Sequence, residues 1–484
     1  MTADTGILSF GAYIPRKRLQ RAAIYAANSW FAPGLKGLAR GERAIANWDE
    51  DTITMAVEAG RDALMGRDRA TLGSVSLAST TLPFADRLNV GIVKEALALP
   101  DNVNAMDTTG SQRAATSLLI QALRGAAAST APHLCIASEL RKARPASEAE
   151  LVQGDASASL LVGTGNPIAR FLGSYSTTHD FVDHFRSTKN DFDYTWESRW
   201  IRDEGHNGLV AAALSAGLAH LAVSASEVTR FILPINARGL ADGLARKAGI
   251  PATAVVDSLA DKVGEAGVAH AYLLLVSALE VAQPGEKILL LGFGQGVDVL
   301  LFETTAAIKD LPARRGVAGS IARGVQDDNY LRWLFHRGQL DLERGMRAES
   351  DEKQPGSTLW RQRKTVLGLI GGRCTKTGTV QFPKTDISVG TNDHSVGTQE
   401  DYPLADVPAT IVTYTADSLT YSPTPPNYFG TIDFDGGGRL MAEFTDVDGD
   451  EVEVGRKVGM MFRIKSFDDK RDFVKYFWKA VPMR

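Results

Sequence analysis

Short β-rich runs alternate with longer Ala- and Leu-rich runs from the N-terminus to about residue 308. Residues 7–15 (ILSFGAYIP), 74–80 (SVSLAST) and 133–139 (HLCIASE) have the composition of strands. Residues 51–65 (DTITMAVEAGRDALM) and 89–99 (NVGIVKEALAL) show the apolar spacing of helices. A chain that alternates in this way predicts an α/β sheet covered by helices.

The alternation begins again after residue 168. Residues 169–178 (ARFLGSYSTT) are expected to form a strand and residues 208–223 (GLVAAALSAGLAHLAV) a helix. Residues 287–303 (KILLLGFGQGVDVLLFE) are typical of a β-hairpin with a Gly-rich centre. The sequence therefore predicts two similar halves, residues 1–165 and 166–310.

The character of the chain changes after residue 310. Residues 311–365 are charged, poor in β-branched runs and interrupted by QPGS, which indicates a helical connector. Residues 366–484 contain many short β-rich pieces separated by Gly, Asp and Pro. This pattern predicts a small all-β barrel of the oligonucleotide/oligosaccharide-binding (OB) type.

Composition excludes several classes of protein. At 484 residues the chain exceeds what one hydrophobic core usually organises, and its net charge of −4 makes nucleic acid an unexpected partner. The N-terminus has no leader pattern and no apolar run reaches the ~18 residues of a spanning helix, so no membrane association is expected. With only Cys135 and Cys374, a disulfide framework is not expected and the cytoplasm is the predicted compartment.

Four segments resemble the HMG-CoA synthase and type III ketoacyl synthase branch of the thiolase superfamily. They are GAYIPRKRL (11–19), DEDTITMAVEAGRDAL (49–64), QGDASASLLVG (153–163) and LLLGFGQGVDVLLFE (289–303). The resemblance covers about residues 5–308. It implies a thiolase-like duplicated αβαβα core ahead of the OB barrel, a CoA thioester as substrate, and a homodimer.

Residues 368–389 (GLIGGRCTKTGTVQFPKTDISV) resemble the zinc ribbon of the OB-fold domain that accompanies thiolase-like proteins in acyl-CoA metabolism. That ribbon carries two Cys-x-x-Cys pairs, whose four thiolates hold a tetrahedral zinc. The matching positions here are Cys374, Thr377, Ser388 and Thr391. One thiolate does not make such a site, so no zinc is predicted.

The resemblance also points to three reactive positions. In the family, the turn before a central helix carries a nucleophilic cysteine that accepts the acyl group. In AMDTTGSQRAATSLLIQAL (105–123) the resemblance places Ser111 there. The segment LPIN has Leu233 where relatives have histidine but keeps Asn236, and Thr80 stands at the position of a glutamate. Because serine without an adjacent base is a weak nucleophile, covalent acyl-enzyme chemistry is not expected.

A catalytic base must then come from elsewhere. Glu265, near the place where ketoacyl synthases keep an active-site asparagine, is the first candidate, although a helix-start carboxylate has the same sequence appearance. His184 is a further candidate for proton transfer, in a segment where Asp183 and Arg186 are expected to pair and fix a loop. His270 begins an apolar helix and is interpreted as a core histidine.

Three functions fit these residues. The leading hypothesis is retro-aldol cleavage of a 3-hydroxyacyl-CoA, in which Ser111 donates a hydrogen bond or fills space. The second is acyl transfer or Claisen condensation, with Ser111 as nucleophile or with a free acceptor. The third is a catalytically silent subunit that supports an active partner. The aromatic segment FDYTWESRW (192–200) fits either a substrate pocket or a subunit interface.

Overall fold

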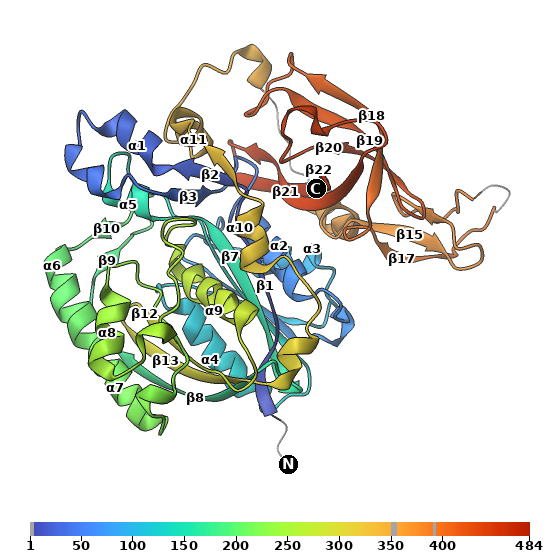
Figure 1. The fold of residues 1–484 in the computed structure, drawn as a ribbon. Coiled ribbons are helices and arrows are strands. Elements are labelled where there is room, and N and C mark those ends of the chain that lie inside the picture. The colour runs from blue at the N-terminus through green and yellow to red at the C-terminus, as the bar shows by residue number, and fades with distance from the viewer. Residues whose placement is uncertain (1–3, 350–355, 391–393) are drawn as a thin grey trace. The chain divides into compact units, whose positions relative to one another are not determined.

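The computed structural model describes residues 4–349, 356–390 and 394–484. The chain divides into two compact units (Figure 1). The first extends to Arg337, and the second begins at Gly338 and also includes the short segments 48–50 and 91–99. None of the helices in the described ranges combines the length and the apolar character that crossing a membrane requires.

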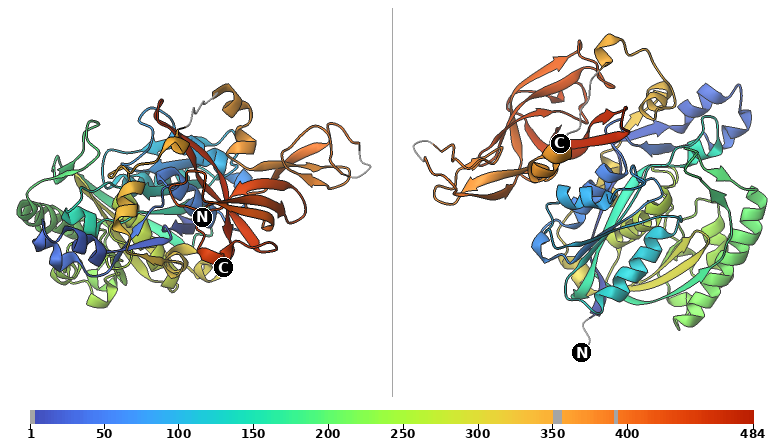
Figure 2. Two further views of the ribbon diagram at one scale, coloured as in Figure 1. Left: turned by 90° about the horizontal axis from the view of Figure 1, so that it is seen from above. Right: turned by 180° about the vertical axis from the view of Figure 1, so that it is seen from behind.

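A nine-stranded mixed sheet organises the first unit (Figures 1 and 2). In spatial order its strands are β11 (Arg230–Ile232), β12 (Lys287–Phe293), β13 (Gly296–Thr304), β8 (Ala169–Thr178), β1 (Asp4–Tyr13), β7 (Ala156–Gly165), β6 (His133–Glu139), β4 (Ser74–Ala78) and β5 (Asn104–Thr108). Strand β1 pairs with both β7 and β8, so it joins the strands of the two predicted halves. The expected α/β core is confirmed.

Helices alternate with these strands along the chain. Those before Arg337 are α1 (Arg21–Asn28), α2 (Thr52–Ala63), α3 (Asn89–Ala96), α4 (Ala114–Ala126), α5 (Glu148–Val152), α6 (Ser198–Trp200), α7 (Ala211–His220), α8 (Leu240–Ala248), α9 (His270–Val281), α10 (Gly316–Ala322) and α11 (Tyr330–His336). A capping box fixes the start of α2, where Asp51 accepts a hydrogen bond from Thr54 N at 2.8 Å.

Helices α4 and α9 form the centre of the first unit. Their apolar side chains share one hydrophobic cluster with β1, β6, β7, β12 and β13. Nine of the twelve residues of α9 are buried, as expected of a helix that is apolar on all faces. The Tyr272 hydroxyl donates to the Ala115 carbonyl at 2.9 Å and so fixes α9 against α4.

The expected connector, residues 311–365, is divided between the two units. Residues 311–337 belong to the first unit and residues 338–365 to the second. Within residues 311–337, β14 (Val325–Asp327) pairs with β2 (Lys17–Gln20), which also pairs with β3 (Glu42–Ile45). The buried Tyr330 in α11 donates to Glu150 at 2.7 Å. These contacts attach residues 311–337 of the predicted helical connector to the first unit.

A five-stranded antiparallel sheet organises the second unit and confirms the all-β prediction. In spatial order its strands are β20 (Arg439–Glu443), β19 (Asn427–Phe434), β18 (Ala409–Asp417), β21 (Lys457–Asp468) and β22 (Phe473–Pro482). Helices α12 (Gly356–Arg361) and α13 (Arg363–Val366) precede a smaller sheet of β15 (Ile370–Cys374), β16 (Val380–Gln381) and β17 (Gln399–Pro403). Buried Trp478 donates to the Leu367 carbonyl at 2.6 Å and attaches α13 to β22.

The positions that resemble a zinc ribbon lie around this smaller sheet. The Cys374 thiol lies 3.3 Å from the Thr398 hydroxyl, and Thr377 lies beside Thr379 at 3.0 Å. Ser388 is buried, whereas Thr391 lies outside the described residues. The described ranges hold no group of three or more His, Cys, Asp or Glu side chains suited to a metal ion. The lack of zinc stays a prediction.

Replacement of Gly154 by alanine tests the packing that positions Glu265. A Cβ at Gly154 would lie 1.9 Å from the Val263 carbonyl oxygen, so Gly154→Ala must displace the adjoining segment. We expect Gly154→Ala to lower the free energy of unfolding by about 1–3 kcal/mol. Gly125→Ala, in α4 with open space around it, should be neutral or stabilising by up to ~1 kcal/mol. Thermal unfolding of both variants checks this, and equal melting temperatures would contradict it.

Candidate active site

A cavity of about 480 Å³ lies in the first unit. Its walls come from the start of α4, the segment after β6, the hairpin of β9 (His184–Phe185) and β10 (Tyr194–Thr195), and the end of β12. Its polar and charged lining residues include Gln112, Arg141, Asp183, His184, Asp193, His206, Asn236 and Glu265. Strand ends and loops from far apart in the sequence therefore converge on one hollow.

Three of the four predicted site residues line this cavity together. Glu265, His184 and Asn236 are all in its wall, although they come from three separate segments. Ser111 is outside the set of described residues that line it. The structure thus brings the candidate proton-transfer groups together, whereas Ser111 adjoins a lining residue, Gln112, and is not itself in the cavity wall.

The Ser111 hydroxyl is engaged with backbone. Its Oγ donates to the Gly294 carbonyl at 2.8 Å and accepts from the Arg113 amide at 3.3 Å. Gly294 lies in the tight turn between β12 and β13, and a Cβ there would be 2.7 Å from Ser111 Oγ. The Gly-rich motif is therefore a hairpin turn, as its sequence predicted, and the structure shows that this turn packs against the start of α4.

Gln112, the next residue, lines the cavity instead. Its Oε1 atom is buried and has no hydrogen-bond partner among the described residues. A Cβ on Gly267 would lie 3.1 Å from this oxygen, so the amide lies against the segment that carries Glu265. The sequence did not single out Gln112. Ser111 and Gln112 are adjacent polar residues in a turn, so the sequence alone does not show which of the two side chains faces a cavity.

Two arginines hold the β9–β10 hairpin beside the cavity. Arg141 donates from Nε to Asp193 at 2.9 Å, and Arg186 donates to the other oxygen of Asp193 at 2.6 Å. Arg186 thus pairs with Asp193 and not with Asp183, which was the expected partner. Asp183 instead lies 3.0 Å from His184 Nδ1 and accepts from Gln295 at 3.3 Å.

Glu265 is held by backbone on both sides. Its amide donates to the Val152 carbonyl at 2.8 Å, and its carbonyl accepts from Gly154 at 2.9 Å. The carboxylate lies 3.9 Å from Arg141, and 29% of the side-chain surface is exposed. Burial raises the pKa of Glu265, and the positive charge of Arg141 opposes this shift only in part. This environment suits a group that exchanges protons at ordinary pH.

Histidines occupy two different environments near Glu265. His270 is fully buried at the start of α9, its Nδ1 accepts from Ala266 at 3.4 Å, and burial lowers its pKa to about 4. It has the features of a core histidine, in agreement with its sequence context. His206 lies in the cavity wall, with its ring edge-on to Phe293 at 5.6 Å.

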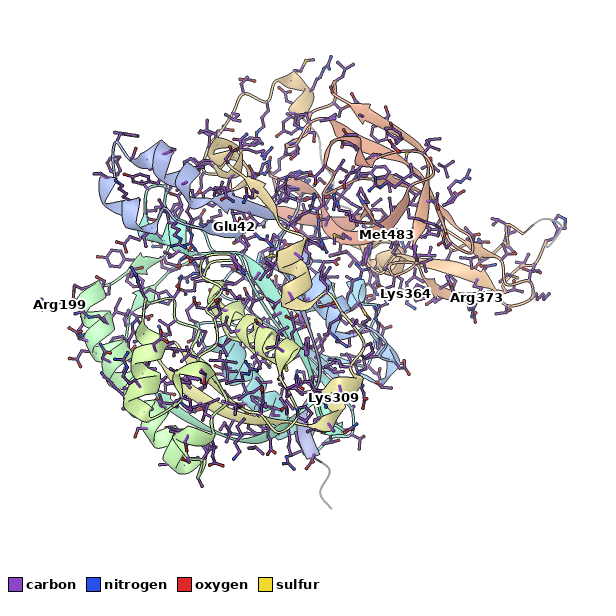
Figure 3. The ribbon with its side chains drawn as sticks, viewed as in Figure 1. Glu42, Arg199, Lys309, Lys364, Arg373 and Met483 are labelled. Carbon is purple, nitrogen blue, oxygen red and sulfur yellow. The ribbon has the colours of Figure 1, made fainter. Side chains whose placement is uncertain are left out.

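The sequence did not indicate that His206 would line the cavity. It lies in a π-helical segment, Ile201–Val210, which follows directly after α6. Arg199 in α6 points to the outside of the unit with its side chain 80% exposed (Figure 3). A π-helix does not follow the 3.6-residue period, so no apolar pattern revealed which side chains turn inward.

The other positions implied by the resemblance are occupied by groups without proton-transfer chemistry. Leu233 is buried in a hydrophobic cluster of the second half. Thr80 donates from its hydroxyl to Glu139 at 2.8 Å and from its amide at 3.0 Å.

Cys135 is fully buried in β6, where burial raises the pKa of its thiol. Cys374 belongs to the second unit, so neither thiol lines the cavity.

Similarity to known proteins covers both units. The first is similar to the hydroxymethylglutaryl-CoA synthase of Archaeoglobus fulgidus, with 28% identity over 348 residues, 69% of this chain and 99% of that protein. Residues 402–463 match the family model of the C-terminal OB-fold domain of ChsH2.

Solved structures agree in fold. An HMG-CoA synthase complexed with CoA has a TM-score of 0.59 at 18% identity, covering 72% of this chain and 95% of that one. The 3-oxoacyl-[acyl-carrier-protein] synthase III of Aquifex aeolicus has a TM-score of 0.52 at 18% identity, covering 62% and 99%. The chain therefore has a thiolase-like α/β fold similar to that of HMG-CoA synthases, followed by a region that matches the C-terminal OB-fold domain of ChsH2 at residues 402–463.

Proposed function

We propose that this protein is a retro-aldolase that cleaves the C2–C3 bond of a 3-hydroxyacyl-CoA. One observation carries the proposal. The cavity combines the Glu265 carboxylate with His184 and Asn236 but contains neither cysteine of the chain. Such a site has groups that move protons and donate hydrogen bonds, and it lacks the thiolate on which an acyl-enzyme would form.

A CoA thioester is the proposed substrate because the similar proteins are named for one. The relatives include HMG-CoA synthases, and one solved structure of that name contains CoA. A cavity of about 480 Å³ falls within the range of small-molecule sites and has room for an acyl group. The proposed reaction needs no metal or redox cofactor.

Glu265 is the proposed general base. Its carboxylate accepts the proton of the 3-hydroxyl, the new carbonyl forms at C3, and the electrons of the C2–C3 bond pass to C2. The products are an aldehyde or ketone and the enolate of a shorter acyl-CoA, which then takes a proton at C2. Asn236 is suited to donate a hydrogen bond to an oxygen that gains negative charge in this step.

The surroundings of Ser111 support the absence of a covalent stage. Its hydroxyl proton is directed to the Gly294 carbonyl, and the position where relatives carry histidine is occupied by buried Leu233. A serine that lacks an adjacent base keeps its proton at neutral pH. We therefore propose that Ser111 is structural and holds the β12–β13 turn against α4.

Condensation or acyl transfer is the second candidate, since the named relatives are synthases. Cleavage and condensation pass through the same enolate, and in the condensation direction protonated Glu265 would return its proton to the 3-oxygen.

A homodimer is also proposed. Strand β5 is at one edge of the large sheet, and an edge strand presents backbone groups to which a second copy could pair.

The reaction class is tested with a panel of 3-hydroxyacyl and 3-oxoacyl thioesters, with and without free CoA. Chromatography should detect a shorter acyl-CoA released from a 3-hydroxy substrate without added CoA. Release from a 3-oxo substrate only when CoA is present would contradict the proposal and indicate thiolysis. Silence across the whole panel would favour a non-catalytic subunit.

Glu265→Gln tests the base. We expect turnover to fall by about 10²–10⁴-fold, the usual contribution of a positioned general base. In the wild type, kcat/KM should decrease as the pH falls through the raised pKa of Glu265, above the ~4.3 of an ordinary glutamate. The decrease occurs on the acid side because only the deprotonated carboxylate accepts a proton.

Two control variants accompany Glu265→Gln. Exposed Glu204, which lies outside the cavity, supplies the matched change Glu204→Gln, and it should keep wild-type turnover. Ser111→Ala should reduce activity without abolishing it. Wild-type turnover in Glu265→Gln would remove this residue from the mechanism, and complete loss in Ser111→Ala would support the acyl-enzyme alternative.

A further inference from the structure

We propose that His206 transfers the proton at C2 of the bound thioester, while Glu265 serves the 3-hydroxyl. This inference rests on the proposed function and assigns a residue to the second of the two proton transfers in that reaction. The retro-aldol step requires two proton transfers, one at oxygen and one at carbon. The structure places two titratable groups in the same cavity on separate segments, Glu265 before α9 and His206 in the π-helical segment.

Close packing turns His206 toward the cavity. Gly205 is buried, and a Cβ there would lie 2.8 Å from the Phe181 ring, so the π-helical segment rests directly on this ring. Phe181 stacks on Trp200 at 4.1 Å and faces Phe293 at 6.3 Å. The His206 ring lies edge-on to Phe293, with 5.6 Å between the ring centroids. π-Helical turns occur frequently at functional sites.

His206 also has an unused nitrogen. Its Nδ1 is buried and has no hydrogen-bond partner within the described part of the chain. The Nδ1 of His184 lies 3.0 Å from Asp183, and that of fully buried His270 accepts from the backbone. A buried nitrogen without a partner is unfavourable unless a ligand or water completes it. His206 therefore suits contact with a bound molecule.

The neighbours of His206 point to C2 and not to the 3-hydroxyl. Phe293 immediately precedes Gly294, whose turn packs against Ser111 and the amide of Gln112 at the start of α4. The amide groups at a helix start suit the thioester oxygen that becomes negative in the enolate. With the thioester oxygen held there, the carbon next to the thioester carbonyl would lie on the side of Phe293 and His206.

Two opposing influences act on the protonation of His206. Burial lowers its pKa and so favours the neutral ring. Asp183 opposes that shift and stabilises the imidazolium once it forms. In cleavage, the imidazolium gives its proton to C2 of the enolate and becomes neutral. The proton taken by Glu265 then returns to His206 through solvent, which balances the cycle. In the reverse direction neutral His206 removes a proton from C2.

The test is exchange of the C2 protons of acetyl-CoA and propionyl-CoA in D₂O, followed by mass spectrometry with the full-length protein. The wild type should incorporate deuterium. His206→Gln and His206→Phe should each lower the exchange rate by about 100-fold or more. The phenylalanine variant keeps the ring contact with Phe293, so a loss in both variants is chemical and not a packing effect. Glu265→Gln should retain exchange.

His220→Gln is the matched control, because His220 is an exposed histidine at the end of α7 and outside the cavity. It should exchange at the wild-type rate. Near-normal exchange in the His206 variants, or equal losses in the His206 and Glu265 variants, would overturn this inference while cleavage by the wild type still upheld the proposed function. A wild type that cleaves without exchanging would also overturn it. Absence of both activities would overturn both proposals.

Discussion

The packing of the β12–β13 turn against the start of α4 is the contact on which the site depends. Gly294 approaches so closely that any Cβ would meet Ser111 Oγ at 2.7 Å and the Arg113 amide at 2.8 Å. The serine hydroxyl bonds to the glycine carbonyl across this contact. The adjoining Gln295, with φ of +48°, reaches Asp183 with its side chain. One turn therefore positions the helix start, Phe293 and the carboxylate beside both cavity histidines.

Electrostatics divides the cavity wall into two environments. The guanidinium groups of Arg141 and Arg186 both donate hydrogen bonds to the Asp193 carboxylate and hold the β9–β10 hairpin in place. Glu265 lies at the margin of this cluster, where Arg141 is 3.9 Å away and burial outweighs its attraction. His206 lies against aromatic rings, where burial favours the neutral form. Burial therefore shifts the two pKa values in opposite directions, since that of Glu265 is raised and that of His206 is lowered.

The sequence predicted the elements that have a clear period. The strands and helices of the first unit, the β12–β13 hairpin and the all-β second unit follow from apolar alternation and turn residues. Glu265, His184 and Asn236 were expected from resemblance, and the structure brings them together. Strand β14 was hidden because its three residues lie within a charged segment.

Residues whose placement depends on irregular backbone escaped prediction. His206 lies in a π-helix, and Gln112 faces the cavity because the turn advances the chain by one residue beyond Ser111. The partner of Arg186 is Asp193 across a hairpin, and the nearer Asp183 in the sequence is not involved. Such pairings are set by tertiary packing, and local spacing does not reveal them.

Intact-protein mass spectrometry during turnover tests the central claim, that chemistry proceeds without an acyl-enzyme. The protein is mixed with an excess of a 3-hydroxyacyl-CoA that it cleaves and is quenched in acid within the first turnover. The protein mass should stay unchanged while the shorter acyl-CoA accumulates. A mass increase equal to the acyl group, located at Ser111 by peptide mapping, would contradict it.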